Sequence, residues 1–400
     1  MNPEDIYAAL LEPAGMAEPY PLYAALRAYG PVIAAGEELV LIPGYDTVNS
    51  VLRDPEFRVD DAEVLERGFP GWQDHPALSA RNLLGTNGAD HRRVRAMLAP
   101  YFTHRRVQEF GPAIATITDQ LLDSLAEHAA GGHPVDFMRE FAYALPVTVI
   151  CELMGVPSAQ RDTFRPLARS LTAILEPEID EATLAEGDAA AVTLNDLFTE
   201  LVADRLARPR DDLISELAAL AGSGDVQLSH EELIGNLALL LIAGFECSTS
   251  MLGNGLSIVF ADRGLGDGLR SGSVDPAGFV EEVLRYEAPV QETGRRRRSP
   301  GEISGVHVTS DDEIILLLGA ANRDPRRFAE PDAFRPERTD GGSLSFGAGL
   351  HFCLGAALAR SEGTIAFLRL LRRFPELGPA GEPERRPGIV RTFDRMPVSL

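Results

Sequence analysis

A single thiol, Cys353, lies in a glycine-rich run at residues 345–355. Gly347 and Gly349 allow backbone conformations closed to other residues, and they let a flat ligand approach closely. The helix predicted after Cys353 directs its positive N-terminal end at the sulfur. This lowers the thiol pKa from its ordinary value of about 8.5 and favours a thiolate. No second cysteine or histidine stands at zinc-ligand spacing, so the pattern indicates the single protein ligand of a haem iron.

A second candidate group is an acid inside a long apolar helix, predicted from Ser229 to Phe260. Ser229 and Glu232 form a capping box at its start. Its centre, residues 243–249, replaces the apolar pattern with a glycine, Glu246 and small polar side chains. A buried acid is costly unless it is paired or used. This helix and the cysteine loop are therefore expected to frame the site.

The pattern Phe346-x-x-Gly349-x-x-x-Cys353-x-Gly355 resembles the haem-ligand loop of the cytochrome P-450 family. Further motifs in the family's order extend the resemblance over nearly the whole chain. It implies a mainly α fold with a small β-rich region, in one domain spanning residues 1–400. Haem b would lie between the long central helix and the cysteine loop, with Cys353 on the iron and Phe346 and Gly355 in the binding loop.

The resemblance also assigns the haem propionates. His91 and Arg95 stand four residues apart, on one face of a helix predicted to begin near Asp90. Together with Arg295 and His351, they match the family's propionate-binding positions. In the family, an acid and an arginine at the positions of Glu282 and Arg285 form a structural ion pair in the haem-side core. Arg338 would be the third partner, and the pair would have no catalytic role.

In the family, an acid and an alcohol at the centre of the long helix relay protons during dioxygen activation. Ala243, Gly244 and Glu246 match that segment, but Cys247 occupies the threonine position. A thiol is only a weak hydrogen-bond donor. Ser248 lies about 100° further round the helix and Thr249 about 200°, so neither replaces the alcohol in a regular helix.

The resemblance implies an oxidoreductase, a monooxygenase that inserts one oxygen atom from O2 into a small organic substrate by hydroxylation or epoxidation, in secondary metabolism such as antibiotic biosynthesis. Two alternatives stay open at Cys247. One is oxidative phenol or aryl coupling without oxygen insertion. The other is a haem protein whose main role is to bind a carrier-bound intermediate. The substrate itself is small, free or attached to a carrier protein. Its expected contacts are Trp72, Leu83, Leu84, Phe245, Val290, Thr293 and Phe393.

The resemblance implies that electrons come from NAD(P)H through an external ferredoxin and ferredoxin reductase, and the sequence itself contains no flavin or iron–sulfur segment. The net charge of −23 argues against a nucleic-acid partner. Against that acidic background, Arg92, Arg93, Arg105 and Arg106 form a local basic patch expected to dock the ferredoxin.

The three cysteines are too scattered for a disulfide framework, and the start of the chain has no basic segment followed by an apolar run. The longest apolar stretch is too short to span a bilayer. We therefore expect a cytoplasmic protein without a membrane partner.

The remaining pattern predicts the supporting elements. Residues 5–29 predict two helices, 32–34 and 39–42 a hairpin around Gly36, and 45–53 a helix. Residues 60–90 predict a long irregular loop, and residues 106–208 are expected to be mostly helical with an acidic turn at 177–187. A helix at 279–286, a strand at 313–318 and a strand-and-turn tail complete the chain.

Overall fold

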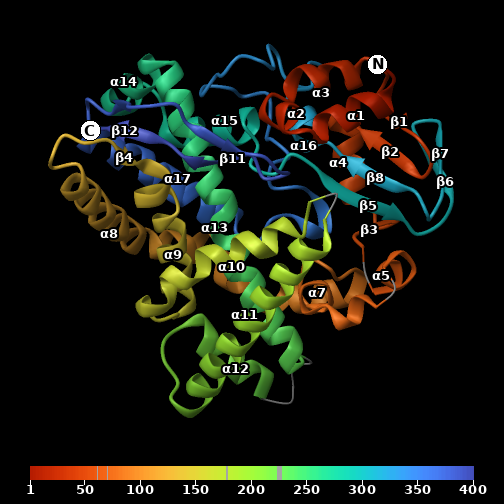
Figure 1. Cartoon of the computed structure of the whole chain (residues 1–400), viewed down its shortest axis with the longest axis horizontal. Helices are drawn as coiled ribbons and strands as arrows, with labels where there is room; N and C mark the ends of the chain where they lie inside the picture. The colour runs from red at the N-terminus through yellow and green to blue at the C-terminus, as the bar shows by residue number, and fades with distance from the viewer. Residues whose placement is uncertain (61, 70, 177–178, 223–227) are drawn as a thin grey trace. The chain divides into compact units, whose positions relative to one another are not determined.

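The structure is a computed structural model that describes residues 1–60, 62–69, 71–176, 179–222 and 228–400 (Figure 1). Contacts divide the chain into two compact units. Unit 1 comprises residues 1–58, 114–142 and 247–400, and unit 2 comprises residues 59–113 and 143–246. Two long helices, α8 (His104–His128) and α13 (His230–Ala261), contribute residues to both units.

A five-stranded sheet forms one side of unit 1, in the order β1-β2-β8-β5-β3 (Figure 1). Its strands are β1 (Ile33–Ala34), β2 (Leu39–Ile42), β8 (Glu313–Leu316), β5 (Thr293–Arg297) and β3 (Phe57–Arg58). The β1–β2 hairpin turns at Gly36, where φ is 97°. β2 pairs in parallel with β8, with Leu39 opposite Glu313, and the other neighbours are antiparallel.

Buried apolar side chains cover both faces of this sheet, because β2 and β8 are continuous hydrophobic runs. One core cluster includes Val40, Ile42 and Leu316 and packs on α4 (Tyr45–Arg53). The other includes Leu41, Ile315 and Leu317 and packs on the first helices. These are α1 (Pro3–Leu11) and α3 (Tyr20–Arg27), and α2 (Pro13–Ala17) lies between them in the sequence.

The rest of unit 1 carries the cysteine loop and its supports. Its helices are η3 (Met138–Ala142), α14 (Arg263–Ser271), α15 (Pro276–Tyr286), α16 (Leu318–Ala321), η5 (Gly349–His351) and α17 (Ala356–Arg373). Its further strands are β4 (Val135–Asp136), β6 (Gly301–Ile303), β7 (Val306–Val308), β9 (Gly378–Pro379), β10 (Glu384–Arg386), β11 (Thr392–Arg395) and β12 (Pro397–Ser399).

The regular elements of unit 2 are all helices among its described residues. It contains α5 (Ala62–Gly68), η1 (Trp72–Asp74), α6 (Pro76–Ser79), α7 (Gly88–Leu98), η2 (Ala99–Phe102), α9 (Ala144–Met154), η4 (Ser158–Gln160), α10 (Arg161–Ala173), α11 (Glu181–Ala207) and α12 (Leu213–Gly222). α10 and α11 lie side by side (Figure 1). The predicted mainly helical fold with a small β-rich region is thus confirmed.

Several predicted boundaries are wrong. Residues 5–29 lie in three helices instead of two, because Pro13 is the first residue of α2 and Pro21 lies in the first turn of α3. The expected loop at 60–90 contains the short helices α5, η1 and α6. The helix carrying His91 begins at Gly88 with Asn87 as its N-cap, so Asp90 lies in the first turn.

The acidic turn predicted at 177–187 is also too long. Residues 177 and 178 lie outside the described residues, but Asp180 accepts a hydrogen bond from the Thr183 N–H and caps α11, which already includes Gly187. α13 is long and apolar enough to cross a membrane by length and composition. However, 67% of its most apolar window is buried inside the protein, as in the core helix of a soluble protein.

Candidate active site

The cysteine loop is held in one conformation by its backbone. Gly347 and Gly349 have φ of 64° and 68°, so both need the left-handed region predicted for them. The Cys353 N–H donates to the Phe346 carbonyl O at 2.9 Å. α17 then begins at Ala356, with Gly355 as N-cap. The loop therefore presents the partly exposed Cys353 thiol just before the start of a helix.

The requirement for glycine at 349 has a second cause that the sequence did not indicate. A Cβ atom at Gly349 would overlap the carbonyl O of Leu52 at the end of α4. Close approach here therefore serves packing of the loop on α4.

Unit 1 also contains two of the expected propionate residues. Arg295 is buried on β5, where its Nη1 donates to the Gly294 carbonyl O at 2.7 Å and Thr293 Oγ1 at 3.2 Å. His351 is partly buried at the end of η5. The next arginines are held by surface carbonyls: Arg296 Nη1 donates to Asp311 O and Arg298 Nε to Pro55 O.

In unit 2, His91 is fully buried on α7. The pKa of His91 is lowered to about 4. Burial is the main cause, and the positive charges of Arg95 and Arg92 contribute the rest, because each of the three disfavours a charged imidazolium. A buried imidazole under the influence of two positive charges is an environment that a bound anion would stabilise. The local electrostatics of unit 2 thus fit a propionate at His91 and Arg95.

The centre of α13 keeps its helical conformation without a break. Ala243 is exposed, and Gly244 and Cys247 are partly buried, whereas Phe245, Glu246 and Ser248 are buried. Ala243 and Cys247 are four residues apart and share one helical face. Of the predicted residues, Ala243 and Cys247 therefore form an open stripe at the centre of the helix, whereas Glu246 and Ser248 are buried.

Gly244 has a packing role within unit 2. A Cβ at this position would approach Ile150 Cγ1 of α9 to 2.7 Å, closer than real Cβ contacts allow. The glycine is thus required by the α9–α13 contact within unit 2, and not only by a ligand on the other side of the helix.

A buried carboxyl group that sequence reasoning missed lies opposite α13 in unit 1. Glu362 on α17 is fully buried, and burial raises its pKa to about 8, while hydrogen bonding to Ser248 offsets part of that shift. The available signal was the i, i+4 series Leu358, Glu362 and Ala366, which predicts one buried helical face with an acid in it.

The predicted structural pair is observed in detail. Arg285 donates from Nε and Nη2 to the two carboxylate oxygens of Glu282 at 2.8 and 2.7 Å. Arg338 Nε approaches Glu282 Oε1 at 3.2 Å, as the third partner should. The side chains of Glu282 and Arg285 are only 3% and 2% exposed, so this pair belongs to the core and not to the helix surface.

The expected substrate residues occupy varied environments. Within unit 2, Leu83 and Phe245 are buried, Leu84 is 50% exposed, and the Trp72 indole Nε1 donates to Glu66 at 3.0 Å. In unit 1, Val290 and Thr293 are partly buried and Phe393 is buried. The guanidinium carbon of Arg385 lies 4.1 Å from the centroid of the Phe393 ring.

The helix that follows Trp72 is fastened to α11 within unit 2. Asp188 on α11 contacts His75 Nδ1 at 2.7 Å and accepts a hydrogen bond from the Ala77 N–H at 3.0 Å. One carboxylate therefore holds the start of α6.

The predicted basic patch is mostly neutralised. Arg93 makes an ion pair with Glu232 at 2.6 Å, Arg105 with Glu109 at 3.0 Å and Arg106 with Glu216 at 3.9 Å. Arg92 is exposed. The patch is thus less basic than its sequence suggests, because acids distant in sequence reach two of the arginines.

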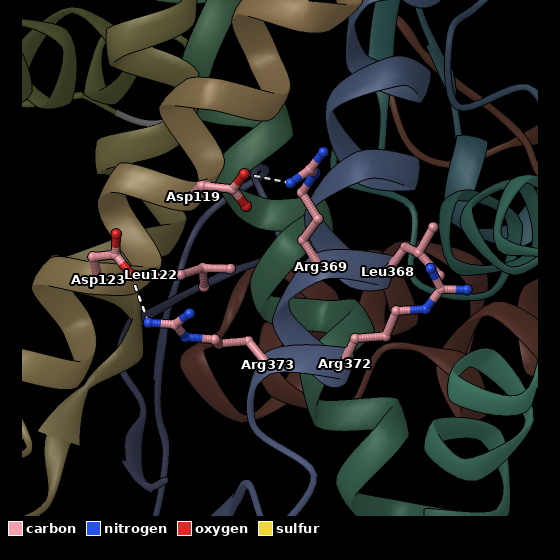
Figure 2. Close-up of a pocket in the computed structure, with 7 residues that line it drawn as sticks. All are labelled: Asp119, Leu122, Asp123, Leu368, Arg369, Arg372 and Arg373. Atoms are coloured by element: carbon pink, nitrogen blue, oxygen red, sulfur yellow. Dashed lines mark hydrogen bonds and ion pairs between the residues drawn. The ribbon is translucent and has the colours of Figure 1, made fainter.

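A groove of about 590 Å³ lies between α8 and the last turns of α17 (Figure 2). Ion pairs between Asp119 and Arg369 and between Asp123 and Arg373 cross it. At about 1.5 Å per helical residue, Arg369 lies roughly 20 Å along α17 from its first residue. The groove is accordingly a contact between α8 and α17 that two ion pairs hold together, and it is separate from the cysteine loop.

Comparisons with known proteins show what the whole chain is similar to. A family profile described as cytochrome P-450 matches residues 277–387. The sequence is 35% identical to 6-deoxyerythronolide B hydroxylase of Saccharopolyspora erythraea, over 95% of this chain and 96% of that protein. It is 34% identical to polyketide biosynthesis cytochrome P-450 PksS of Bacillus subtilis, with coverage of 90% and 88%.

Among solved structures, P-450BioI in complex with hexadec-9Z-enoic acid ligated acyl carrier protein is similar, with a TM-score of 0.89 and 32% identity. The match covers 97% of this chain and 99% of that chain.

Proposed function

Because the chain belongs to the cytochrome P-450 family of haem monooxygenases, we propose that it inserts one oxygen atom from O2 into a small organic substrate in secondary metabolism. We further propose that residues 1–400 act as one domain in the cytoplasm. The polyketide-related and carrier-bound substrates in the names of similar proteins support a polyketide-like substrate, free or attached to a carrier protein.

The family implies a haem whose iron is ligated by cysteine. The observation that carries the assignment to Cys353 is its loop, in which two left-handed glycines and the Cys353 N–H bond to Phe346 hold the thiol before α17. Arg295 and His351 in unit 1, and His91 and Arg95 in unit 2, supply the positive and hydrogen-bonding groups that suit propionates. When bound, a thiolate-ligated haem supplies the chemistry of O–O cleavage.

Reduction of the protein under carbon monoxide tests this assignment. Wild type is expected to show the red-shifted ferrous–CO absorption band of thiolate ligation, and Cys353→Ala is expected to lose it. Cys151→Ala is the matched control, because Cys151 is buried on α9, and burial raises its thiol pKa to about 12. An unshifted band in wild type, or a shifted band in Cys353→Ala, contradicts the assignment.

The chain's own residues supply protons and order water. Glu246 is a buried acid two residues before Ser248, and Cys247 lies on the open stripe between them. Because the Cys247 thiol is only a weak hydrogen-bond donor, water or a substrate hydroxyl takes over the proton relay that an alcohol performs at this position in the family. Ser248 and Glu362 form a second polar pair beside this segment, and Glu362 holds a proton at neutral pH because its pKa is about 8. This supply of protons favours oxygen insertion over coupling or simple binding.

Cys247→Thr tests how protons are delivered. If the thiol at 247 limits delivery, the threonine variant should direct a several-fold larger share of NADH into product and release less hydrogen peroxide. The measurement is NADH consumed, peroxide released and 18O2-derived label in the product. Glu246→Gln is the control and should impair product formation in either case.

Tight coupling in wild type that threonine leaves unchanged contradicts a deficient relay at Cys247. A product without label in both proteins supports oxidative coupling instead of oxygen insertion.

Electrons are expected from NAD(P)H through a ferredoxin and its reductase. Arg92 is the member of the predicted basic patch that best fits a docking role, because it is exposed, whereas Arg93, Arg105 and Arg106 pair with acids. On a chain with a net charge of −23, one such local cation favours an acidic partner of small size.

A further inference from the structure

Arg360 on α17 forms a three-way contact beside the cysteine loop. Its Nε and Nη2 donate to the two carboxylate oxygens of Glu281 on α15, the latter at 3.2 Å. Its guanidinium carbon also lies 4.4 Å from the centroid of the Phe346 ring. The side chains of Arg360 and Glu281 are 38% and 41% exposed. A bidentate pair stacked on an aromatic ring has a fixed orientation, unlike an ordinary surface ion pair.

Phe346 links this charge pair to Cys353. The Phe346 ring is buried and packs edge-on against Phe352. The backbone carbonyl O of Phe346 accepts a hydrogen bond from the Cys353 N–H. One residue thus touches the Arg360 cation through its ring and the cysteine backbone through its carbonyl. Phe346 therefore connects the Arg360–Glu281 pair to the residue that carries the thiol.

We propose that Arg360 and Glu281 are positioning residues which orient Phe346 against the cysteine loop and whose opposite charges set how readily the Cys353-ligated haem iron accepts an electron. This inference rests on the proposed function. A nearby cation stabilises the reduced state and a nearby anion destabilises it. Arg360 therefore raises the reduction potential of the haem, and Glu281 lowers it.

The two charges make opposite predictions, which separates this role from a merely structural one. Arg360→Gln leaves Glu281 unneutralised and should lower the midpoint potential. At a fixed solution potential, the ferrous-to-ferric ratio should fall roughly threefold to tenfold for a partly screened charge near the site. Glu281→Gln should raise the ratio by a similar factor, and the double variant should lie near wild type.

Spectroelectrochemical titration of the holoenzyme measures these ratios. Arg372→Gln is the matched control, because Arg372 is exposed on the same helix and makes no ion pair among the residues described. Shifts of opposite sign in the two single variants support the proposal. Shifts of the same sign, or potentials equal to that of Arg372→Gln, overturn it.

The ferrous–CO band of each protein distinguishes the two levels of inference. A red-shifted band with unchanged potentials overturns the charge pair alone. Absence of that band in wild type overturns the proposed function and this inference together.

Discussion

Replacing Arg285 by methionine is expected to lower the free energy of unfolding by about 3–5 kcal/mol, because it leaves a buried carboxylate without its main cation. Besides Glu282, the Arg285 guanidinium donates to the carbonyl oxygens of Asn322, Pro331 and Ala333 at 2.8–3.0 Å. The substitution therefore leaves three carbonyl groups and one carboxylate short of donors. Since whole domains are stable by only about 5–15 kcal/mol, the variant should yield little haem-loaded protein at 37 °C.

The matched control for Arg285→Met is Arg395→Met. Arg395 pairs with Glu384 at 3.0 Å, but the two side chains are 54% and 60% exposed. Such a surface pair contributes about 0–1 kcal/mol. Urea unfolding followed by circular dichroism compares the two variants with wild type. Equal unfolding midpoints for Arg285→Met and wild type would show that the remaining partners of Glu282, Arg338 and the Arg335 N–H, suffice to hold it.

Glu362→Gln is expected to stabilise the protein in alkaline but not in acidic solution. The carboxyl pKa is 4.5 in the unfolded reference and about 8 in the folded protein, because burial penalises the charged form. Below pH 4.5 both states are protonated and the carboxyl costs nothing. Between pH 4.5 and 8 only the unfolded chain releases the proton, so wild-type stability falls as pH rises.

The expected gap between Glu362→Gln and wild type grows by up to about 1.4 kcal/mol per pH unit across this window and is constant above it. Thermal unfolding of both proteins at pH 5, 6, 7, 8 and 9 measures the gap. Glu382→Gln, which replaces an exposed carboxyl, is the control. Wild type should also show an infrared band of a protonated carboxyl that fades through about pH 8. A gap that does not change with pH contradicts the prediction.

The sequence predicted best what depends on neighbours along the chain. The helix at Tyr45–Arg53 has the expected limits, and the hairpin around Gly36 differs from its prediction only in starting at Ile33 instead of Val32. The Ser229–Glu232 capping box is present, with both hydrogen bonds at 2.9 and 3.1 Å. The left-handed glycines before Cys353 were also predictable, because only glycine adopts that conformation without strain.

Features that depend on distant partners were not predictable in the same way. The resemblance gave Arg93 no partner, yet it pairs with Glu232, 139 residues away. The acid at Glu362 looked unremarkable because only tertiary packing buries it. The sequence also does not show that Ile150 fills the space beside Gly244, or that Leu52 fills the space beside Gly349. Sequence patterns indicate that a glycine is needed, but the reason comes from the neighbour that packs against it.

The hydrogen bond between Trp72 and Glu66 has a spectroscopic consequence. Trp72 is the only tryptophan among the 400 residues, so all indole fluorescence of the protein originates in the segment between α5 and α6. Its emission maximum depends on the polarity around the ring and on whether Nε1 donates to the Glu66 carboxylate at 3.0 Å. The protein therefore contains an intrinsic optical reporter for this one segment, readable without any attached dye.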